Sequence, residues 1–268
     1  MYTNHRSYGI FFLLLLPIFL ACAPTATPWD IDIPEKYRNL TTENLQRLPQ
    51  TRSSHLPFTF AIIGDPQGTP GDFHTTLDRI NDNQEVAFAL VLGDMTDYGL
   101  KHEYVWAAEA IQRSQVPVMT VIGNHDAISF GKKIYQSMFG AFNYTFEYSG
   151  IRFVMWNNNL LEFGETNFDW LTEVSDERSI IASHIPPVVD IHNAEQIIEW
   201  QKINENAGII SSLHGHRGGQ RSFYWQEKDV PYYVVARNRG GYYALVTVTE
   251  EHEVKIKHCQ TVCQEEGL

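Results

Sequence analysis

Polar residues that could hold a metal ion or a phosphate group follow three apolar runs in the first half of the chain. The runs 58–63, 86–92 and 116–122 lead into Gly64-Asp-Pro-Gln-Gly68, Gly93-Asp-Met-Thr-Asp97 and Gly123-Asn-His-Asp126. Asp94 follows Asp65 by 29 residues and Asn124 follows Asp94 by 30, a period that fits successive βαβ units. Carboxylate, amide and imidazole groups at this spacing indicate a metal site.

The apolar runs have the length and composition of buried strands. In open α/β sheets, ligands bind beyond the carboxyl ends of the strands. We therefore expect Asp65, Asp94, Asn124 and His125 to meet at one edge of a sheet.

Two later histidines extend this pattern. His184 follows the strand-like run 179–183, and His216 stands in a Gly-His pair. The order D-x-Q, G-D-x-x-D, G-N-H-D, a lone histidine and G-H resembles the calcineurin-like metallophosphoesterase superfamily, over roughly residues 58–258. Apart from the lone histidine, each of the four motifs is weak alone, but the four in this order, each after a strand, are a strong signal.

The resemblance implies an α/β fold in which two mixed β-sheets pack as a sandwich flanked by helices. It also implies hydrolysis of a phosphate monoester or diester by a hydroxide held at divalent metal ions, with two ions expected. Imidazole and oxygen ligands favour Zn²⁺, Mn²⁺ or Fe ions over Ca²⁺. By position, Asp65 and Gln67 would belong to a first ion, Asp94 would bridge the two ions, and Asn124, His184 and His216 would hold the second ion.

The first metal position departs from the family pattern. The family commonly has D-x-H and G-H-x-H, whereas this chain has Gln67 and Gly218 at the positions of two imidazoles. Gln67 can still offer a carbonyl oxygen, but Gly218 offers no side chain. His214 would share a strand face with His216 and could compensate; the alternative is a hydrogen-bonded histidine at a strand end. His74 is a weaker candidate.

Three further residues match roles at the reaction centre. In the family the histidine after Asn124, here His125, faces the phosphate, and imidazole suits a general acid. Asp97 matches the aspartate that holds that histidine, although it could instead cap a turn. Arg217 is the arginine best placed to hold phosphate oxygens. Arg237 and Arg239 are weaker candidates, because exposed arginines near a sheet end are common.

These residues leave three functional hypotheses open. The first is a binuclear phosphoesterase whose substrate is a small phosphate ester or a phosphorylated molecule. The others are a mononuclear hydrolase and a metal-binding scaffold without turnover. The formal charge of −12 argues against nucleic acid as a bulk partner, because binding to a phosphate backbone needs basic patches.

The ends of the chain indicate export. Residues 1–22 resemble a secretory leader, and Phe19-Leu-Ala-Cys22 resembles a lipoprotein cleavage box. Acyl chains on Cys22 would anchor the protein to a bacterial membrane, facing the periplasm or the cell surface. Residues 23–56 are expected to form a tether with one short helix, residues 57–258 the catalytic domain and residues 259–268 a tail. Cys259 and Cys263 could pair or remain free thiols.

Local patterns place the remaining elements. Helical periodicity covers residues 72–81, 102–114, 129–139, 167–174 and 194–204. Strand patterns cover residues 145–148, 151–157, 179–183, 209–213, 222–226, 232–236, 242–248 and 253–257. Tyr148-Ser-Gly-Ile151 is typical of a hairpin turn, and the later strands are expected to be antiparallel.

Overall fold

The computed structural model describes residues 27, 29–48, 55–187, 194–219, 223–227 and 230–265. The predicted leader and Cys22 lie outside the described residues. Within the described part of the chain, no helix is both long and apolar enough to cross a membrane.

The first sheet has six strands in the order β12-β11-β10-β1-β2-β3. Their bounds are β1 (Phe58–Ile63), β2 (Val86–Leu92), β3 (Val118–Val121), β10 (Tyr243–Val248), β11 (Val254–Cys259) and β12 (Cys263–Glu265). β1, β2 and β3 are parallel, as the three motifs predict, whereas β10, β11 and β12 pair antiparallel. The parallel strands bring the ends of the three apolar runs to one edge.

The second sheet has the order β4-β5-β6-β7-β9-β8. Its strands are β4 (Tyr144–Tyr148), β5 (Ile151–Met155), β6 (Ser179–Ala182), β7 (Ser211–His214), β8 (Phe223–Glu227) and β9 (Val230–Val234). The hairpin at Tyr148–Ile151 is confirmed. The expectation that the later strands are antiparallel is wrong for β6, β7 and β9, which run parallel to β5. In sequence, α7 lies between β6 and β7, and β8, which is antiparallel to β9, lies between β7 and β9.

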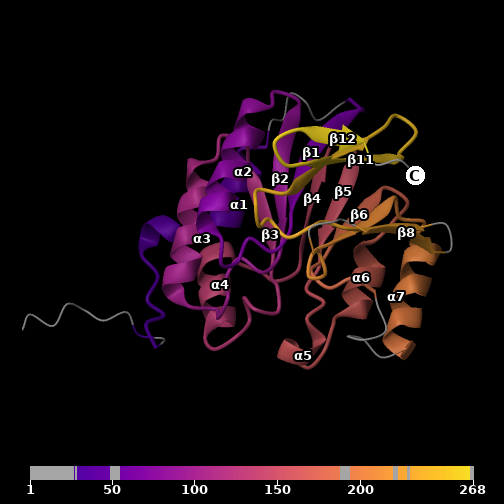
Figure 1. Ribbon diagram of the computed structural model, residues 1–268. Helices are drawn as coiled ribbons and strands as arrows, with labels where there is room; N and C mark the ends of the chain where they lie inside the picture. Colours follow the sequence, from indigo (N-terminus) through magenta and orange to yellow (C-terminus); the bar gives the residue numbers. More distant parts are fainter. Residues whose placement is uncertain are drawn as a thin grey trace, which may run out of the picture.

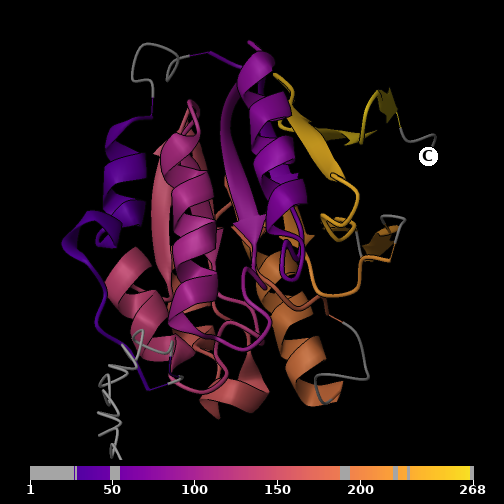
Figure 2. The ribbon, with the colours of Figure 1, turned by 60° about the vertical axis from the view of Figure 1, so that its left-hand side comes forward.

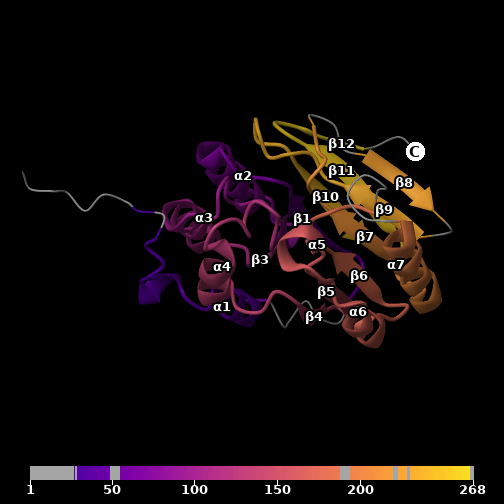
Figure 3. The ribbon, with the colours of Figure 1, turned by 90° about the horizontal axis from the view of Figure 1, so that it is seen from below.

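Helices cover both outer faces of the sandwich (Figures 1 and 3). The first sheet is covered by α1 (Leu40–Gln46), α2 (Pro70–Asp82), α3 (Lys101–Arg113) and α4 (Gly131–Phe139), the second by α6 (Phe168–Val174) and α7 (Ala194–Ala207). A short helix, α5 (Leu160–Phe163), and a 3₁₀ turn (Glu35–Tyr37) complete the described elements. The expected sandwich of two mixed sheets flanked by helices is confirmed.

An apolar core lies between the two sheets. Phe60 and Phe88 stack at 5.1 Å between ring centroids, and Phe153 from the second sheet meets both edge-on. All seven residues of β2 are buried, because helices cover one face of the strand and the second sheet covers the other. This explains why the run before Gly93 is apolar without alternation.

The segment before the first motif is part of the fold and not only a tether. Tyr37 and Leu40 are buried in the core under the helices of the first sheet. The Asn44 side chain donates to Leu40 O at 2.8 Å and accepts from Val118 N at 2.9 Å, which satisfies a backbone donor at the start of β3. Residues 29–48 lie beside α3 and α4 (Figure 2). This packing could not be predicted from the sequence, because the segment is proline-rich and has little apolar periodicity.

The end of the chain also belongs to a sheet. β12 pairs with β11, and a disulfide joins Cys259 to Cys263 across this pair. Residues 259–265 therefore belong to the edge of the first sheet, where the sequence predicted a C-terminal tail.

Candidate metal centre

Four side chains converge where β2, β3, β6 and β7 end. His184 Nε2 lies 3.2 Å from Asp94 Oδ2 and 3.0 Å from Asn124 Oδ1. His216 Nδ1 lies 3.0 Å from both Asn124 Oδ1 and His184 Nε2. Ligand atoms of Asp94, His184 and His216 lie within 4.8 Å of one another. The structure thus brings together all four residues predicted for the second metal ion.

The surroundings of His184 suit a bound cation. Its Nδ1 donates to Leu92 O at 2.7 Å, which directs Nε2 toward the Asp94 carboxylate and the Asn124 amide oxygen. Burial opposes the charged imidazole, but the Asp94 and Asp65 carboxylates outweigh it and raise the pKa of His184 to about 9. Asp94 and Asn124 each present an acceptor oxygen to His184 Nε2. A proton or a metal ion must supply positive charge there, and the donor set of one carboxylate, one amide and two imidazoles fits Zn²⁺, Mn²⁺ or Fe²⁺.

Glycines allow the motif loops to pack closely. A Cβ on Gly93, whose φ is +86°, would lie 2.5 Å from His184 Nδ1, and a Cβ on Gly123 would overlap the backbone and carboxylate of Asp94. Asp94 and His216 themselves have positive φ, which is uncommon outside glycine. Each of these two residues directly follows a glycine, so the sharp turn at the strand end aims its side chain into the cluster.

At the first metal position, Asp65 has protein partners on both oxygens. Oδ1 accepts from His216 N at 2.9 Å, and Oδ2 lies 4.0 Å from Arg237 Nε. Burial raises the pKa of Asp65 to about 6, although His184 opposes that shift. Gln67 is buried, and in the amide orientation that satisfies both its ends it donates to Thr96 O and accepts from Arg237 Nη2, each at 2.9 Å.

Gly218 leaves no room for the histidine that the family has at this position. A Cβ on Gly218 would lie 2.6 Å from Arg237 N and would overlap Val235 O. The cause is the backbone that continues from β9, because Arg237 N donates to Gly218 O at 3.1 Å. Two strand extensions therefore run side by side where a ligand side chain would have to pass.

His214 points away from the centre. It is the last residue of β7, and its Nδ1 lies 3.1 Å from Ser183 Oγ, while its ring meets Trp200 and Tyr232 in the core under α7. The expected shared face with His216 does not form, because the strand ends at His214 and His216 has a φ of +70°. Of the two readings left open by the sequence, the hydrogen-bonded core histidine matches this placement. His74 lies on α2 and is not among the clustered ligands of the described residues.

His125 stands beside the cluster, and the contact that orients it is a backbone one. Its amide donates to Asp94 Oδ1 at 3.0 Å, and its Nδ1 lies 2.8 Å from the carbonyl oxygen of Asp97. The carbonyl of Asp97, and not the carboxylate that the resemblance implied, fixes the ring. Arg217 is exposed at the turn directly after His216.

Sequence reasoning missed the residue that joins the two motif loops. Asp126, the last residue of G-N-H-D, accepts from Thr96 N, Thr96 Oγ1 and Gly123 N at 2.9–3.0 Å. Burial and the nearby Asp94 raise the pKa of Asp126 to about 7. Its place directly after the predicted acid, His125, was the available signal, and its role is to hold the G-D-x-x-D loop against the G-N-H-D loop.

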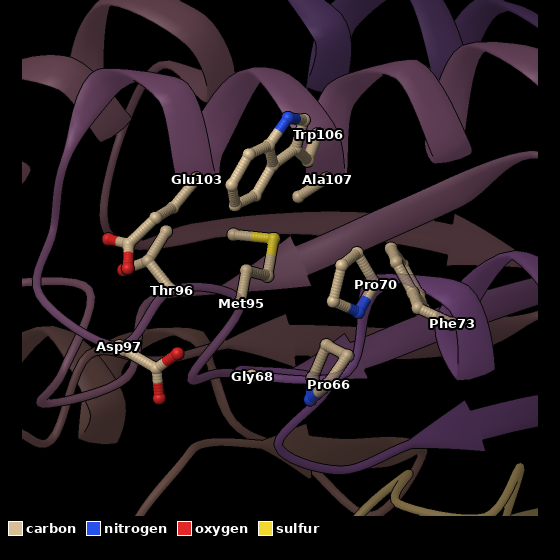
Figure 4. A pocket seen from close by; sticks show the side chains of 10 residues that line it. All are labelled: Pro66, Gly68, Pro70, Phe73, Met95, Thr96, Asp97, Glu103, Trp106 and Ala107. Carbon is tan, nitrogen blue, oxygen red and sulfur yellow. The ribbon is translucent and has the colours of Figure 1, made fainter. Parts of the chain in front are cut away.

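A cavity of about 240 Å³ lies next to the centre, between α2, α3 and the motif loops (Figure 4). Met95 lies beneath the Trp106 indole, with Phe73 on the α2 side and Asp97 on the opposite side. The remaining lining residues are Pro66, Gly68, Pro70, Thr96, Glu103 and Ala107. Asp97 therefore links the cavity to the metal centre, because it lines the cavity and its carbonyl contacts His125.

Comparison with known proteins decides the family. The model of the calcineurin-like phosphoesterase family matches residues 58–237, which contain all the motifs above. The chain belongs to the calcineurin-like phosphoesterase family. This confirms the family predicted from the motifs.

Three solved structures show the same fold in this family member. The first is a purple acid phosphatase, PPD1, from yellow lupin seeds, with 15% identity and a TM-score of 0.58 over 80% of this chain and 53% of that chain. The second is GAP50, the anchor in the inner membrane complex of Plasmodium, with 10% identity and a TM-score of 0.57 over 80% of this chain and 90% of that chain. The third is PhoD, with 10% identity and a TM-score of 0.55 over 82% of this chain and 73% of that chain. At these identities the likeness concerns the fold alone. No curated protein matches the sequence.

Proposed function

We propose that this phosphoesterase family member hydrolyses small phosphate esters with a divalent metal ion held by Asp94, Asn124, His184 and His216. The observation that carries the proposal is the convergence of these four side chains, with His184 Nε2 within 3.2 Å of Asp94, Asn124 and His216. A divalent ion bound there would act as a Lewis acid and would lower the pKa of water to near neutrality.

The protein groups around that ion have separable tasks. Leu92 O fixes the Nδ1 proton of His184, so that Nε2 is the ligand atom. Asp97 O fixes the Nδ1 proton of His125, so that Nε2 faces the substrate. Once this ring is protonated, Nε2–H can stabilise the phosphoryl oxygens and donate its proton to the departing alcohol oxygen. Arg217, exposed directly after His216, would bind phosphate oxygens.

The cavity beneath Trp106 would receive the alcohol part of the substrate. Its apolar wall is formed by Phe73, Met95 and Trp106, and its acidic rim by Asp97 and Glu103. This lining favours an alcohol with an apolar or positively charged portion over a second phosphate, since carboxylates repel anions.

The test is an assay of the purified protein with aryl phosphate monoesters and diesters, after chelation and after return of Mn²⁺, Zn²⁺ or Fe²⁺. We expect turnover only with added metal and little turnover from His216→Gln at any metal concentration. Turnover that survives complete chelation would contradict the proposal. Bound metal without turnover on any ester would instead favour a metal-binding scaffold, the reading that the incomplete first metal position supports.

Export and anchoring remain proposals from the sequence. Acylation of Cys22 would place the enzyme on a membrane surface, where its substrates would be phosphate esters outside the cytoplasm. Labelling with a radioactive fatty acid tests this, because Cys22→Ser should lose the label while Cys259→Ser should keep it. Equal labelling of the wild type and Cys22→Ser would contradict it.

A further inference from the structure

The side chains at the first metal position surround an arginine. Arg237 follows β9, and its Nη2 donates to the Gln67 amide oxygen at 2.9 Å while its Nε lies 4.0 Å from Asp65 Oδ2. Its backbone is fixed beside the same motif, because residue 237 forms a bridge with Gly64 and Asn238 N donates to Gly64 O at 2.7 Å. The guanidinium therefore reaches the two residues that the resemblance assigns to the first ion.

We propose that the guanidinium of Arg237 takes the place of the first metal ion, so that the active centre is mononuclear. This inference rests on the proposed function, since it assigns the charges at the same site. Asp65 is 2% exposed, and a buried carboxylate of this kind needs a positive partner. Arginine supplies a permanent charge that no change of pH within the working range removes.

The protein groups that could hold an ion at the first position are missing or already hydrogen-bonded. Gly218 has no side chain, and the backbone at Val235 and Arg237 fills the space where one would lie. The Gln67 carbonyl oxygen accepts from Arg237, and Asp65 Oδ1 accepts from His216 N. The Arg237 guanidinium would also repel a dication placed at the first position, beside Asp65 and Gln67.

The guanidinium can also act on the substrate. The Arg237 side chain is 44% exposed, so the N–H groups that do not face Gln67 and Asp65 can bind a phosphate oxygen. A phosphate would then lie between one metal ion, held by Asp94, Asn124, His184 and His216, and one arginine. Removal of Arg237 should therefore weaken phosphate binding and slow turnover while the bound metal remains.

The experiment combines elemental analysis, calorimetry and kinetics on the full chain. The wild type is loaded with excess Mn²⁺ or Zn²⁺, freed of unbound metal and analysed for ions per chain, with one ion expected. Arg237→Ala should also hold one ion, but its affinity for inorganic phosphate should fall about 10-fold or more, and kcat/KM for an aryl phosphate should fall about 100-fold. Arg113→Ala, exposed at the end of α3, is the matched control and should behave as the wild type.

The outcomes separate this inference from the proposed function. Two ions per chain in the wild type would overturn the inference and leave the hydrolase standing, as would unchanged phosphate affinity and turnover in Arg237→Ala. One ion with Arg237-dependent phosphate binding but no turnover on any ester would support the inference and contradict the proposed hydrolysis. Should Arg237→Ala fail to fold, Arg237→Lys keeps the charge without the planar fork, and the wild-type ion count still decides.

Discussion

Two neighbouring positions of one site keep different amounts of the family's metal chemistry. At the second position, Asp94, Asn124, His184 and His216 converge. His184 Nε2 faces oxygens of Asp94 and Asn124, an arrangement that a bound cation would stabilise. At the first position, Asp65 and Gln67 face Arg237, and the backbone closes over Gly218. From this comparison we infer that the Arg237 guanidinium, a charge from elsewhere in the fold, compensates for the missing imidazoles at the first position.

Removal of a ligand at the second position should have the largest effect. His184→Ala should lower metal affinity by more than about 100-fold, since even the partners of metal ligands contribute 10- to 100-fold, and turnover should fall to background. Elemental analysis and kinetics measure both. His74→Ala, on the side of α2, is the control and should retain metal and activity. Normal metal content in His184→Ala would contradict the ligand assignment.

Loss of His125, which stands beside the metal cluster, should separate metal binding from chemistry. His125→Ala should keep one ion per chain but lose about 100-fold or more in kcat, because imidazole acid catalysis is typically of that size. Asp97→Asn should lose far less, since the ring is fixed by the Asp97 carbonyl and not by its carboxylate. Equal losses in the two variants would show that the carboxylate orients the histidine after all.

The close backbone packing around Gly218 predicts that Gly218→Ala and Gly219→Ala differ in their free energy of unfolding. Gly218→Ala should destabilise the fold by about 1–3 kcal/mol, because the added Cβ would meet the backbone of Val235 and Arg237. Nothing lies within 4 Å of a Cβ on Gly219, so Gly219→Ala should change stability by less than about 0.5 kcal/mol. Denaturant unfolding compares them. A neutral Gly218→Ala would show that the position has room for a ligand side chain.

The smallest expected effect concerns the partner of Arg237. Gln67→Ala removes the hydrogen bonds to Arg237 Nη2 and Thr96 O, and should lower kcat/KM several-fold, corresponding to about 1 kcal/mol for one such bond. Metal content should stay at one ion per chain. Gln136→Ala, exposed on α4, is the matched control. A gain of a second ion in Gln67→His would mean that only the side chain at residue 67 had kept it out.

Most of the fold and the second metal position could be predicted because their signals are local. Asp94 and Asn124 each follow a glycine at the end of an apolar run, and a run of that kind indicates a buried strand. The direction of β6, β7 and β9 could not be predicted, because residues 179–234 carry the same apolar pattern in a parallel as in an antiparallel sheet.

At the first metal position, the sequence predicted the missing ligands but not the arginine that lies there. Gln67 and Gly218 show in the sequence that two imidazoles are missing, but nothing near residue 65 indicates that residue 237 will lie beside it. That proximity comes from the pairing of β7 with β9 and the extension of β9 past Gly64. The spacing of His214 and His216 suggested that His214 could replace a missing ligand. The positive φ of His216 ends the strand geometry, so the two side chains do not share a face and His214 lies outside the site.

Anomalous diffraction from crystals of the Mn²⁺-loaded protein would show whether the centre holds one ion or two. We expect a single anomalous peak, bounded by Asp94, Asn124, His184 and His216, with the Arg237 guanidinium beside Asp65 and Gln67. A second peak of comparable height bound to Asp65 and Gln67, with Arg237 displaced, would contradict this expectation.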